Sequence, residues 1–118
     1  AGGKLTGKYR QGKAAPENSR EKPENFSEGT WKALNGLEAL VKEKGVSMTA
    51  FALAWLNAQP GVSSPIIGPN SAAQLEDNLA ASDVTVTDDD KKRVDELVAP
   101  GTHVEDYYRA DFGPNARW

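Results

Sequence analysis

Apolar residues recur every three or four positions between Ser27 and Gly45, and they are Trp31, Leu34, Leu37, Leu40 and Val41. This spacing places them on one face of an amphipathic helix. Polar residues occupy most of the other positions, as in a face turned to solvent. Gly45 is the expected end of the helix, because glycine enters the left-handed region without a Cβ penalty.

A second helix is predicted to begin after Ser47, which can cap its first turn. Val46, just before this cap, is placed to pack against Phe51 as a hydrophobic staple. The helix should end within residues 57–61, because Pro60 disfavours helical backbone at the residue before it. Its predicted buried face consists of Met48, Phe51, Ala52, Trp55 and Leu56.

Residues 62–68 are too few and too apolar for a surface helix, and they are bounded by Gly61 and by Gly68-Pro69. The pattern predicts one fully buried strand. A single buried strand cannot satisfy its own backbone N–H and C=O groups. We therefore expect it to pair with backbone from outside its local helices, supplied either by a second copy of the chain or by a segment that this chain lacks.

Two further helices are predicted after the strand. Ser71 opens the first, with Gln74 at capping-box spacing, and Leu75, Asn78 and Leu79 follow on one face of this helix. Residues 84–87 form a short extended connector that ends in Thr87, the cap of the last helix. The first turn of this helix carries the favourable charge for its end of the helix dipole, in Asp88, Asp89 and Asp90. Its predicted buried face consists of Val94, Leu97 and Val98.

The predicted elements divide the chain into three parts. Residues 1–26 are rich in Gly, Pro and Lys without an apolar period, and they predict a long loop, either an ordered ligand-binding loop or a frayed end. Residues 27–99 hold the helices and the strand. Residues 100–118 form an irregular tail whose aromatic residues are Tyr107, Tyr108, Phe112 and Trp118.

The composition limits the function classes. With 118 residues the chain is of one-domain size. Its net charge of −3 gives no electrostatic reason to expect binding to nucleic acid or to an anionic membrane. The absence of cysteine excludes disulfides and thiolate metal sites and fits a cytoplasmic protein. No apolar run approaches the roughly 20 residues that span a bilayer, and no His, Asp and Glu residues have metal-ligand spacing.

The junction between the strand and the third helix carries the most informative chemistry. The first N–H groups of a helix have no intrahelical partner, and together with the helix dipole they bind phosphate. Residues 68–71 lead into such an end. The residues alone also fit a plainer interpretation, in which Ser71 and Gln74 only cap each other's backbone.

The same segment resembles the cofactor signature of the aldo-keto reductases, with Gly68, Gln74, Leu75, Asp77 and Asn78 at the matching positions. The resemblance implies that Gly68 and Asn70 lie near the adenosine ribose and its 2′-phosphate. It also implies that the 2′-phosphate and adenine are reached by Gln74, Asp77 and Asn78. Many relatives carry Arg or Lys at or next to the position of Asn70. Because a 2′-phosphate gains most from a charged partner, the absence of a cation here argues against a strong preference for NADP(H) over NAD(H).

The first nine residues provide a second match. They resemble the loop that follows the seventh barrel strand in the same family, which folds over the cofactor pyrophosphate. The matching residues are Gly3, Leu5, Thr6, Gly7, Lys8 and Tyr9. Glycines let the backbone approach phosphate, and Lys8 supplies a cation. The resemblance places Gly3, Lys8 and Arg20 at the phosphates, although Arg20 also fits a solvated loop charge.

The resemblance implies an α/β fold, in which the chain is the C-terminal fragment of a (β/α)8 TIM barrel and is mostly helical with about one barrel strand. A complete barrel needs roughly 250 residues. The implied function is the cofactor-binding part of an oxidoreductase that reduces aldehydes and ketones to alcohols with NADP(H), or with NAD(H). Its partners would be a small carbonyl substrate and either the missing N-terminal barrel segment or a second copy.

The catalytic groups of that family do not match residues of this chain. The family uses a Tyr proton donor with Lys, Asp and His, and neither His103 nor any Tyr of this sequence matches those positions. We therefore expect the chain alone to be inactive. The alternative is a non-catalytic truncated module that self-associates or binds a nucleotide. The aromatic tail, which in the family often lines the substrate pocket, would do so here or would only dock onto the body.

Overall fold

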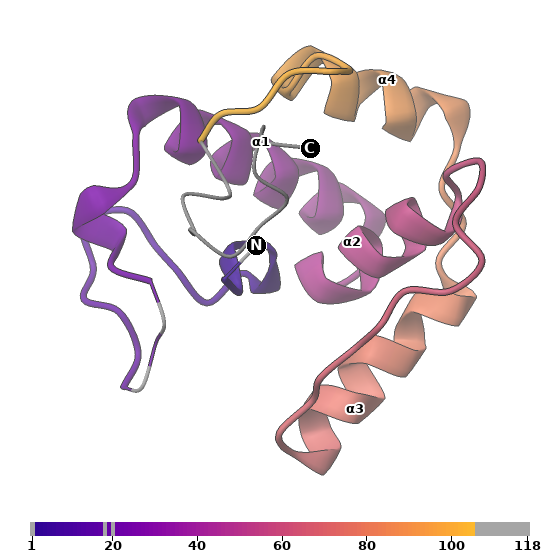
Figure 1. Cartoon of the computed structure of the whole chain (residues 1–118), viewed down its shortest axis with the longest axis horizontal. Coiled ribbons are helices and arrows are strands. Elements are labelled where there is room, and N and C mark those ends of the chain that lie inside the picture. Colours follow the sequence, from indigo (N-terminus) through magenta and orange to yellow (C-terminus); the bar gives the residue numbers. More distant parts are fainter. Residues whose placement is uncertain (1, 18, 20, 106–118) are drawn as a thin grey trace, which may run out of the picture.

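The computed structural model describes residues 2–17, 19 and 21–105 of the chain. Within this part every regular element is helical (Figure 1). The α-helices are α1 (Glu28–Lys44), α2 (Met48–Asn57), α3 (Ala72–Leu79) and α4 (Asp88–Leu97). The 3-10 turns are η1 (Lys4–Thr6), η2 (Pro23–Asn25) and η3 (Ala80–Asp83). Helices α1, α2 and α4 form a body, from which α3 and the extended segment before it project.

The helix starts predicted at Ser47, Ser71 and Thr87 are confirmed by their caps, and Ser27 caps α1 in the same way. The hydroxyl groups of Ser27, Ser47, Ser71 and Thr87 each accept a hydrogen bond from the backbone N–H three residues later. Such caps satisfy one of the free N–H groups at a helix start, and each contributes about 1 kcal/mol. The local sequence therefore decides where these helices begin.

The turn between α1 and α2 is fixed by a glycine. Gly45 has a φ of 68°, in the left-handed region. Its N–H donates to the carbonyl of Lys42 at 3.2 Å, and the N–H of Val46 donates to the carbonyl of Val41 at 3.1 Å. These two bonds form a Schellman motif. The motif turns the chain so that α2 packs back against α1.

The main core lies where α1, α2 and α4 meet. Leu40 and Phe51 are its most deeply buried side chains, with 1% and 2% of their surface exposed. Burial of such a side chain stabilises a fold by about 1.5–3 kcal/mol. Val41 and Met48 complete the buried cluster, and the partly buried residues around it are Leu37, Val46, Trp55, Val84, Val86 and Val94. The core thus joins both long helices to the connector and helix that follow α3.

A glycine sets the distance between α1 and α4. A Cβ atom on Gly36 would lie 2.3 Å from Cδ2 of Leu97. A larger residue would displace Leu97 or push α4 away, so Gly36 allows Leu97 to cover α1. The face predicted for α4 does turn inward, but its residues Val94, Leu97 and Val98 are half-buried instead of buried.

A carboxylate fixes the start of α4. Oδ2 of Asp90 accepts a hydrogen bond from the N–H of Thr87 at 2.8 Å, and the N–H of Asp90 donates to the Thr87 hydroxyl at 3.1 Å. The same Oδ2 accepts a bond from Nζ of Lys44 at 2.7 Å, which links α4 to the end of α1. Burial opposes the ionisation of Asp90, but the hydrogen bonds from Lys44 and Thr87 outweigh burial and lower the pKa of its carboxyl group.

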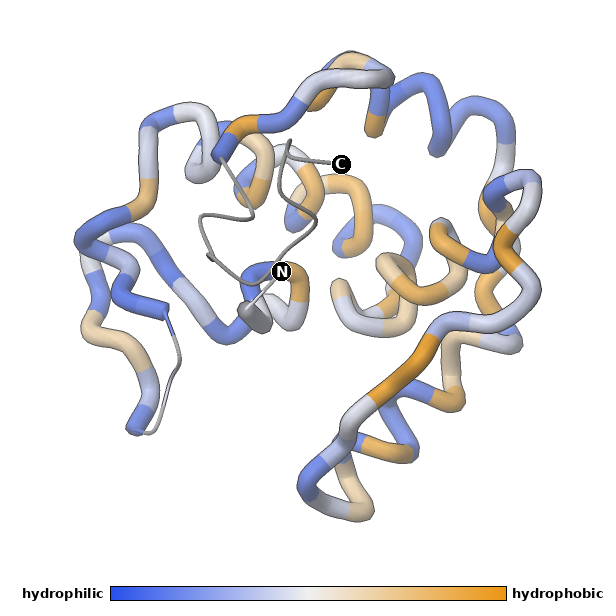
Figure 2. Tube along the Cα trace, in the orientation of Figure 1, coloured by the Kyte–Doolittle hydropathy of each residue, from blue (hydrophilic) through white to orange (hydrophobic). Residues whose placement is uncertain are grey.

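The strand predicted at residues 62–68 is not formed. The segment is extended, but it belongs to no strand pair and is largely exposed, and Ile66 is fully exposed. It leads away from the body to the start of α3, and Figure 2 shows that it carries an apolar stretch. The physical reason is that the described part of the chain contains no second strand with which its backbone could pair.

The buried face predicted for α2 is wrong at Leu56, and the face of α3 that carries Leu75 and Leu79 is not covered. Leu56, Leu75 and Leu79 are exposed, at 38%, 41% and 59%. Helix α3 has no buried residue at all. Besides the side with Met48 and Phe51, α2 has a second covered side, on which Ala81 of η3 packs against Ala50 and Ala54. We call residues 62–79 the arm, because its apolar side chains lack the cover that the sequence pattern predicts.

Replacing Asp90 with alanine should destabilise the chain by about 2–3 kcal/mol, because it removes a helix cap and a charged hydrogen bond together. Urea unfolding at pH 7 measures this loss. The pKa of Asp90 is lowered in the folded state, so its contribution is present above the unfolded value of about 3.9 and is lost as pH falls through the folded value. The matched control is Asp89→Ala, an exposed first-turn change that should cost less than about 1 kcal/mol. Equal losses in the two variants would contradict the role of Asp90.

The arm yields a second prediction. Among the described residues, no backbone hydrogen bond is donated by the N–H groups of residues 63–68. In the chain alone these amides should exchange with deuterium as fast as those of an unfolded peptide, while the amides of Leu40 and Phe51 are protected. Exchange measured at two protein concentrations also tests pairing with a second copy. Protection of residues 63–68 that does not depend on concentration would contradict the open arm.

Candidate functional site

The N-terminal loop folds back on itself through Tyr9. The phenol of Tyr9 donates a hydrogen bond to the carbonyl of Gly2 at 3.3 Å and accepts one from the N–H of Glu21 at 3.3 Å. Its ring is 3% exposed and packs edge-on against Phe26, with ring centroids 5.3 Å apart. One buried side chain therefore ties together the start and the end of the segment 2–21.

Glycines let this loop close tightly. Gly2 has a φ of 56°, and a Cβ atom at this position would lie 2.3 Å from Oε1 of Glu21. Gly3 has a φ of 80°, and its Cβ would lie 3.1 Å from Nζ of Lys8. The structure thus brings together Gly3 and Lys8, two of the residues predicted to meet the cofactor phosphates. The third, Arg20, lies outside the described residues.

Lys8 is exposed, and its Nζ lies 4.9 Å from the centroid of the Tyr9 ring. A cation over an aromatic face gains roughly 0.5–1 kcal/mol at an exposed site. Because this contact leaves the ammonium group open to solvent, Lys8 keeps hydrogen-bonding capacity for an anion. Arg10, the next cation along the loop, is held in an ion pair with Glu38 at 3.2 Å.

At the second predicted site, the start of α3 is capped by its own residues. The hydroxyl of Ser71 accepts a hydrogen bond from the N–H of Gln74 at 3.2 Å, as predicted. In return, Oε1 of Gln74 accepts a bond from the N–H of Asn70 at 2.7 Å, one residue earlier than in a capping box. The N–H groups of Ala72 and Ala73 have no hydrogen-bond partner among the described residues. Two donors therefore remain available to an anion.

The other predicted residues of this junction differ in exposure. Gly68 is exposed, with no atom within 4 Å of the place where its Cβ would lie. Asn70 is also exposed, while Asp77 and Asn78 are half-buried. The predicted residues therefore form an accessible surface along one end and one side of α3.

The two predicted groups are not in contact with each other. Both η1 and α3 pack against α2, but the start of α3 lies at the far end of the arm, away from η1 (Figure 1). Among the described residues, no hydrogen bond or ion pair joins the Gly3–Lys8 group to the Asn70–Gln74 group. A ligand that contacts both groups has to span the space between them or to bring the arm closer.

A cavity of about 510 Å³ lies elsewhere, between α1, α2, α4 and η1. Its walls are mainly apolar and include Leu34, Leu37, Met48, Phe51, Trp55 and Val94. None of the described residues predicted to hold a cofactor lines it. Trp55 keeps its buried Nε1–H without a hydrogen-bond partner in the described part of the chain. Sequence reasoning did not predict this cavity, because its walls come from segments distant in sequence.

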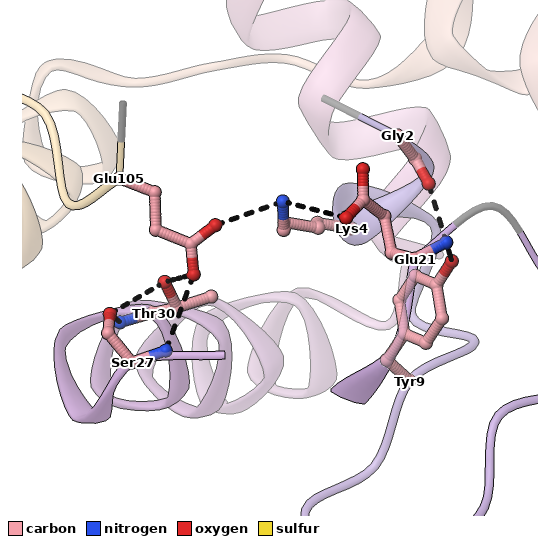
Figure 3. A network of polar contacts seen from close by, with 7 residues as sticks. All are labelled: Gly2, Lys4, Tyr9, Glu21, Ser27, Thr30 and Glu105. Carbon is pink, nitrogen blue, oxygen red and sulfur yellow. Dashed lines mark hydrogen bonds and ion pairs between the residues drawn. The ribbon is translucent and has the colours of Figure 1, made fainter. Parts of the chain in front are cut away.

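Lys4, Glu21, Thr30 and Glu105 line part of this cavity. They belong to the polar network drawn in Figure 3. Nζ of Lys4 lies 3.0 Å from Oε2 of Glu105 and 3.6 Å from Oε2 of Glu21. Oε1 of Glu105 accepts hydrogen bonds from the hydroxyl of Thr30 and from the N–H of Ser27, the latter at 3.4 Å. Residues from the loop, from the start of α1 and from the segment after α4 therefore meet at the carboxylate of Glu105.

The network changes the ionisation of its members. Burial opposes the ionisation of Glu105, but hydrogen bonds from Thr30, Lys4 and the backbone of Ser27 outweigh it and lower the pKa of Glu105. Burial likewise opposes the charge of Lys4, but its contacts with Glu105 and Glu21 outweigh it and raise the pKa of Lys4. Both groups are charged at neutral pH. Sequence reasoning missed Glu105, because its partners Thr30 and Ser27 are more than 70 residues away in the chain.

The described residues also lack metal-binding clusters and helices that could span a membrane. They contain no group of three or more His, Cys, Asp or Glu side chains that could hold a metal ion. In the same residues, no helix is long and apolar enough to cross a membrane. His103 lies on the cavity wall. The aromatic tail residues Tyr107, Tyr108, Phe112 and Trp118 lie outside the described residues, so the prediction for the tail stays a prediction.

Known proteins resemble this chain over most of its length. Residues 1–99 match the profile of the Aldo/keto reductase family. A probable voltage-gated potassium channel subunit beta of Oryza sativa subsp. japonica is 38% identical over 92 residues, which cover 71% of this chain and 28% of that protein. The L-glyceraldehyde 3-phosphate reductase of Escherichia coli O157:H7 is 32% identical over 112 residues, covering 86% of this chain and 32% of that protein.

An uncharacterized oxidoreductase, YrpG, of Bacillus subtilis (strain 168) is 29% identical over 109 residues, covering 92% of this chain and 33% of that protein. The chain thus spans about a third of the length of these curated relatives.

Replacing Tyr9 with phenylalanine should loosen the N-terminal loop. The change removes the hydroxyl that joins Gly2 to Glu21 and should cost about 1 kcal/mol, the net value of a typical hydrogen bond. Deuterium exchange at the Glu21 amide should become faster. The control is Ser82→Ala, which deletes an exposed hydroxyl on η3 and should leave Glu21 unchanged. Unchanged exchange at Glu21 in Tyr9→Phe would show that the phenol does not close the loop.

Proposed function

The chain belongs to the aldo/keto reductase family, and from this premise we propose that it holds the adenosine and phosphate end of NADP(H). The full-length protein would be a (β/α)8 barrel that reduces aldehydes or ketones to alcohols. The observation that carries the proposal is the presence, within the residues matched by the family, of two separate groups of residues suited to bind phosphate. One is the open helix start beside Asn70, and the other is the glycine loop with Lys8.

The start of α3 suits the adenosine end of the cofactor. The free N–H groups of Ala72 and Ala73 can donate hydrogen bonds to a 2′-phosphate at the positive end of the helix dipole. Asn70 and Gln74 are exposed beside them and offer neutral amide groups. The half-buried Asp77 and Asn78 would reach the 2′-phosphate and the adenine. Residues 68–78, all of them described, include no Lys or Arg, so NAD(H) would bind with only modestly lower affinity.

The N-terminal loop suits the pyrophosphate. Lys8 keeps its ammonium group exposed next to Gly3, where the missing side chain lets an anion approach the backbone. Arg20 would add a second cation. Each charge-assisted hydrogen bond of this kind contributes roughly 1.5–3 kcal/mol.

The chain's part in the reaction is to bind and orient. When bound, the nicotinamide cofactor supplies the hydride for carbonyl reduction. The residues proposed here hold the opposite end of that cofactor, and no catalytic role is proposed for any residue of this chain. The name of the Escherichia coli relative, a glyceraldehyde phosphate reductase, supports a small aldehyde as the substrate class. The proton donor and the rest of the substrate pocket would come from the other strands of the barrel.

Self-association is the second candidate, and the exposed arm favours it. Ile66, Leu75 and Leu79 present apolar surface that nothing in the described part of the chain covers. In the full-length protein the other barrel strands would cover it. For the chain alone, a second copy would be the available cover, and sedimentation velocity at increasing concentration distinguishes a monomer from such an assembly.

The cofactor proposal is tested by Asn70→Arg in the full-length protein. A cation at this position should strengthen NADPH binding about tenfold relative to NADH, equal to about 1.4 kcal/mol, because it would pair with the 2′-phosphate. The measurement is the pair of dissociation constants for wild type and variant. Asn57→Arg at the end of α2 is the control for added charge and should leave the ratio unchanged. A wild type that binds neither cofactor, or an unchanged ratio in Asn70→Arg, would contradict the assignment.

A further inference from the structure

We propose that Glu105 is a positioning residue for the N-terminal loop. In this role its carboxylate holds Lys4 against the start of α1 and so sets the geometry in which Gly3 and Lys8 meet a cofactor phosphate. The proposal rests on the proposed function, because it concerns the same phosphate group. It adds a residue that lies outside the stretch matched by the family, since that match ends at residue 99.

The contacts of Glu105 satisfy both of its carboxylate oxygens. Oε2 pairs with Nζ of Lys4 at 3.0 Å, while Oε1 accepts bonds from the Thr30 hydroxyl and the Ser27 N–H (Figure 3). Thr30 is buried, with 3% of its surface exposed. Because Thr30 and Ser27 belong to the capped start of α1, Glu105 is anchored on a rigid element and can hold Lys4 in turn.

Lys4 connects Glu105 to the residues proposed to bind phosphate. It follows Gly3 directly and is the first residue of η1, so fixing Lys4 also fixes the backbone of Gly3. Its Nζ reaches Glu21 at 3.6 Å and lies 5.1 Å from the centroid of the Phe26 ring. Glu21 in turn donates its N–H to Tyr9, the residue next to Lys8. The loop therefore has two ties, one through Tyr9 within the loop and one through Glu105 to the body.

A packing role alone would not require this charge. Lys4 and Glu105 are partly exposed, with 19% and 28% of their side chains accessible, so the pair itself adds little to global stability. Its energetic effect should fall on the loop that it restrains. A loop that is already ordered loses less conformational entropy when a ligand binds. The ligand therefore binds with higher affinity.

The test is Glu105→Gln in the full-length protein, with Glu96→Gln on the exposed side of α4 as the matched control. Loss of the charge should weaken NADPH binding about three- to tenfold. Binding of adenosine 2′-monophosphate should not change, because this probe reaches only the α3 end. The melting temperature should stay within a few degrees of wild type. Glu96→Gln should change none of these values.

A double-mutant cycle with Lys4→Gln completes the test. The two substitutions should be non-additive in NADPH affinity, because each removes the same pair. Equal weakening of NADPH and adenosine 2′-monophosphate, full additivity, or unchanged NADPH affinity in Glu105→Gln would overturn the proposal.

The failure of the proposed function gives a different result, which is a wild type that binds neither probe. In that case deuterium exchange of the Gly3 to Lys8 amides without ligand still decides whether Glu105 restrains the loop. Faster exchange in Glu105→Gln supports the restraint, and unchanged exchange overturns it.

Discussion

The burial of Leu40 and Phe51 between α1 and α2 is the interaction on which the rest of the structure depends. The Schellman turn at Gly45 brings the two helices together. Their shared apolar face then receives Val94 of α4 and the connector that precedes it. The N-terminal turn η1 also packs against α2. The N-terminal loop also packs on α1, where Tyr9 joins Trp31 and Leu34, and Glu105 accepts a hydrogen bond from Thr30 at the start of the same helix.

The features that the sequence predicted well are local. Caps such as Ser47 and Thr87 act on a backbone N–H three residues away, and Gly45 acts on its own φ. The failed predictions concern partners distant in the chain. The strand at residues 62–68 was expected from an apolar run, but a strand forms only where a second strand supplies hydrogen bonds. Leu75 and Leu79 are exposed because no described element covers their side of α3. The spacing of apolar residues shows that they share a helix face, but it does not show which element covers that face.

In the candidate site, too, local features were predictable from the sequence and contacts between distant residues were not. The glycine loop and the helix start could be found from residue types and spacing, and the structure places Gly3 beside Lys8 and Asn70 beside Gln74. Whether the two groups serve one ligand depends on elements between them, and the order of residues in the chain does not contain that information. The contact of Glu105 with Lys4 and Thr30 likewise arises only in the folded chain. A charge in an irregular tail gives no periodic or motif signal.

The most direct test of the central claim is deuterium exchange of the full-length protein with and without saturating NADPH. If the loop holds the pyrophosphate and the start of α3 holds the adenosine of one cofactor, the amides of residues 2–9 and 70–75 gain protection together. The residues that line the cavity between α1, α2 and α4 then keep their exchange rates. Protection confined to the cavity, or to only one of the two segments, would contradict the assignment of both segments to one cofactor site.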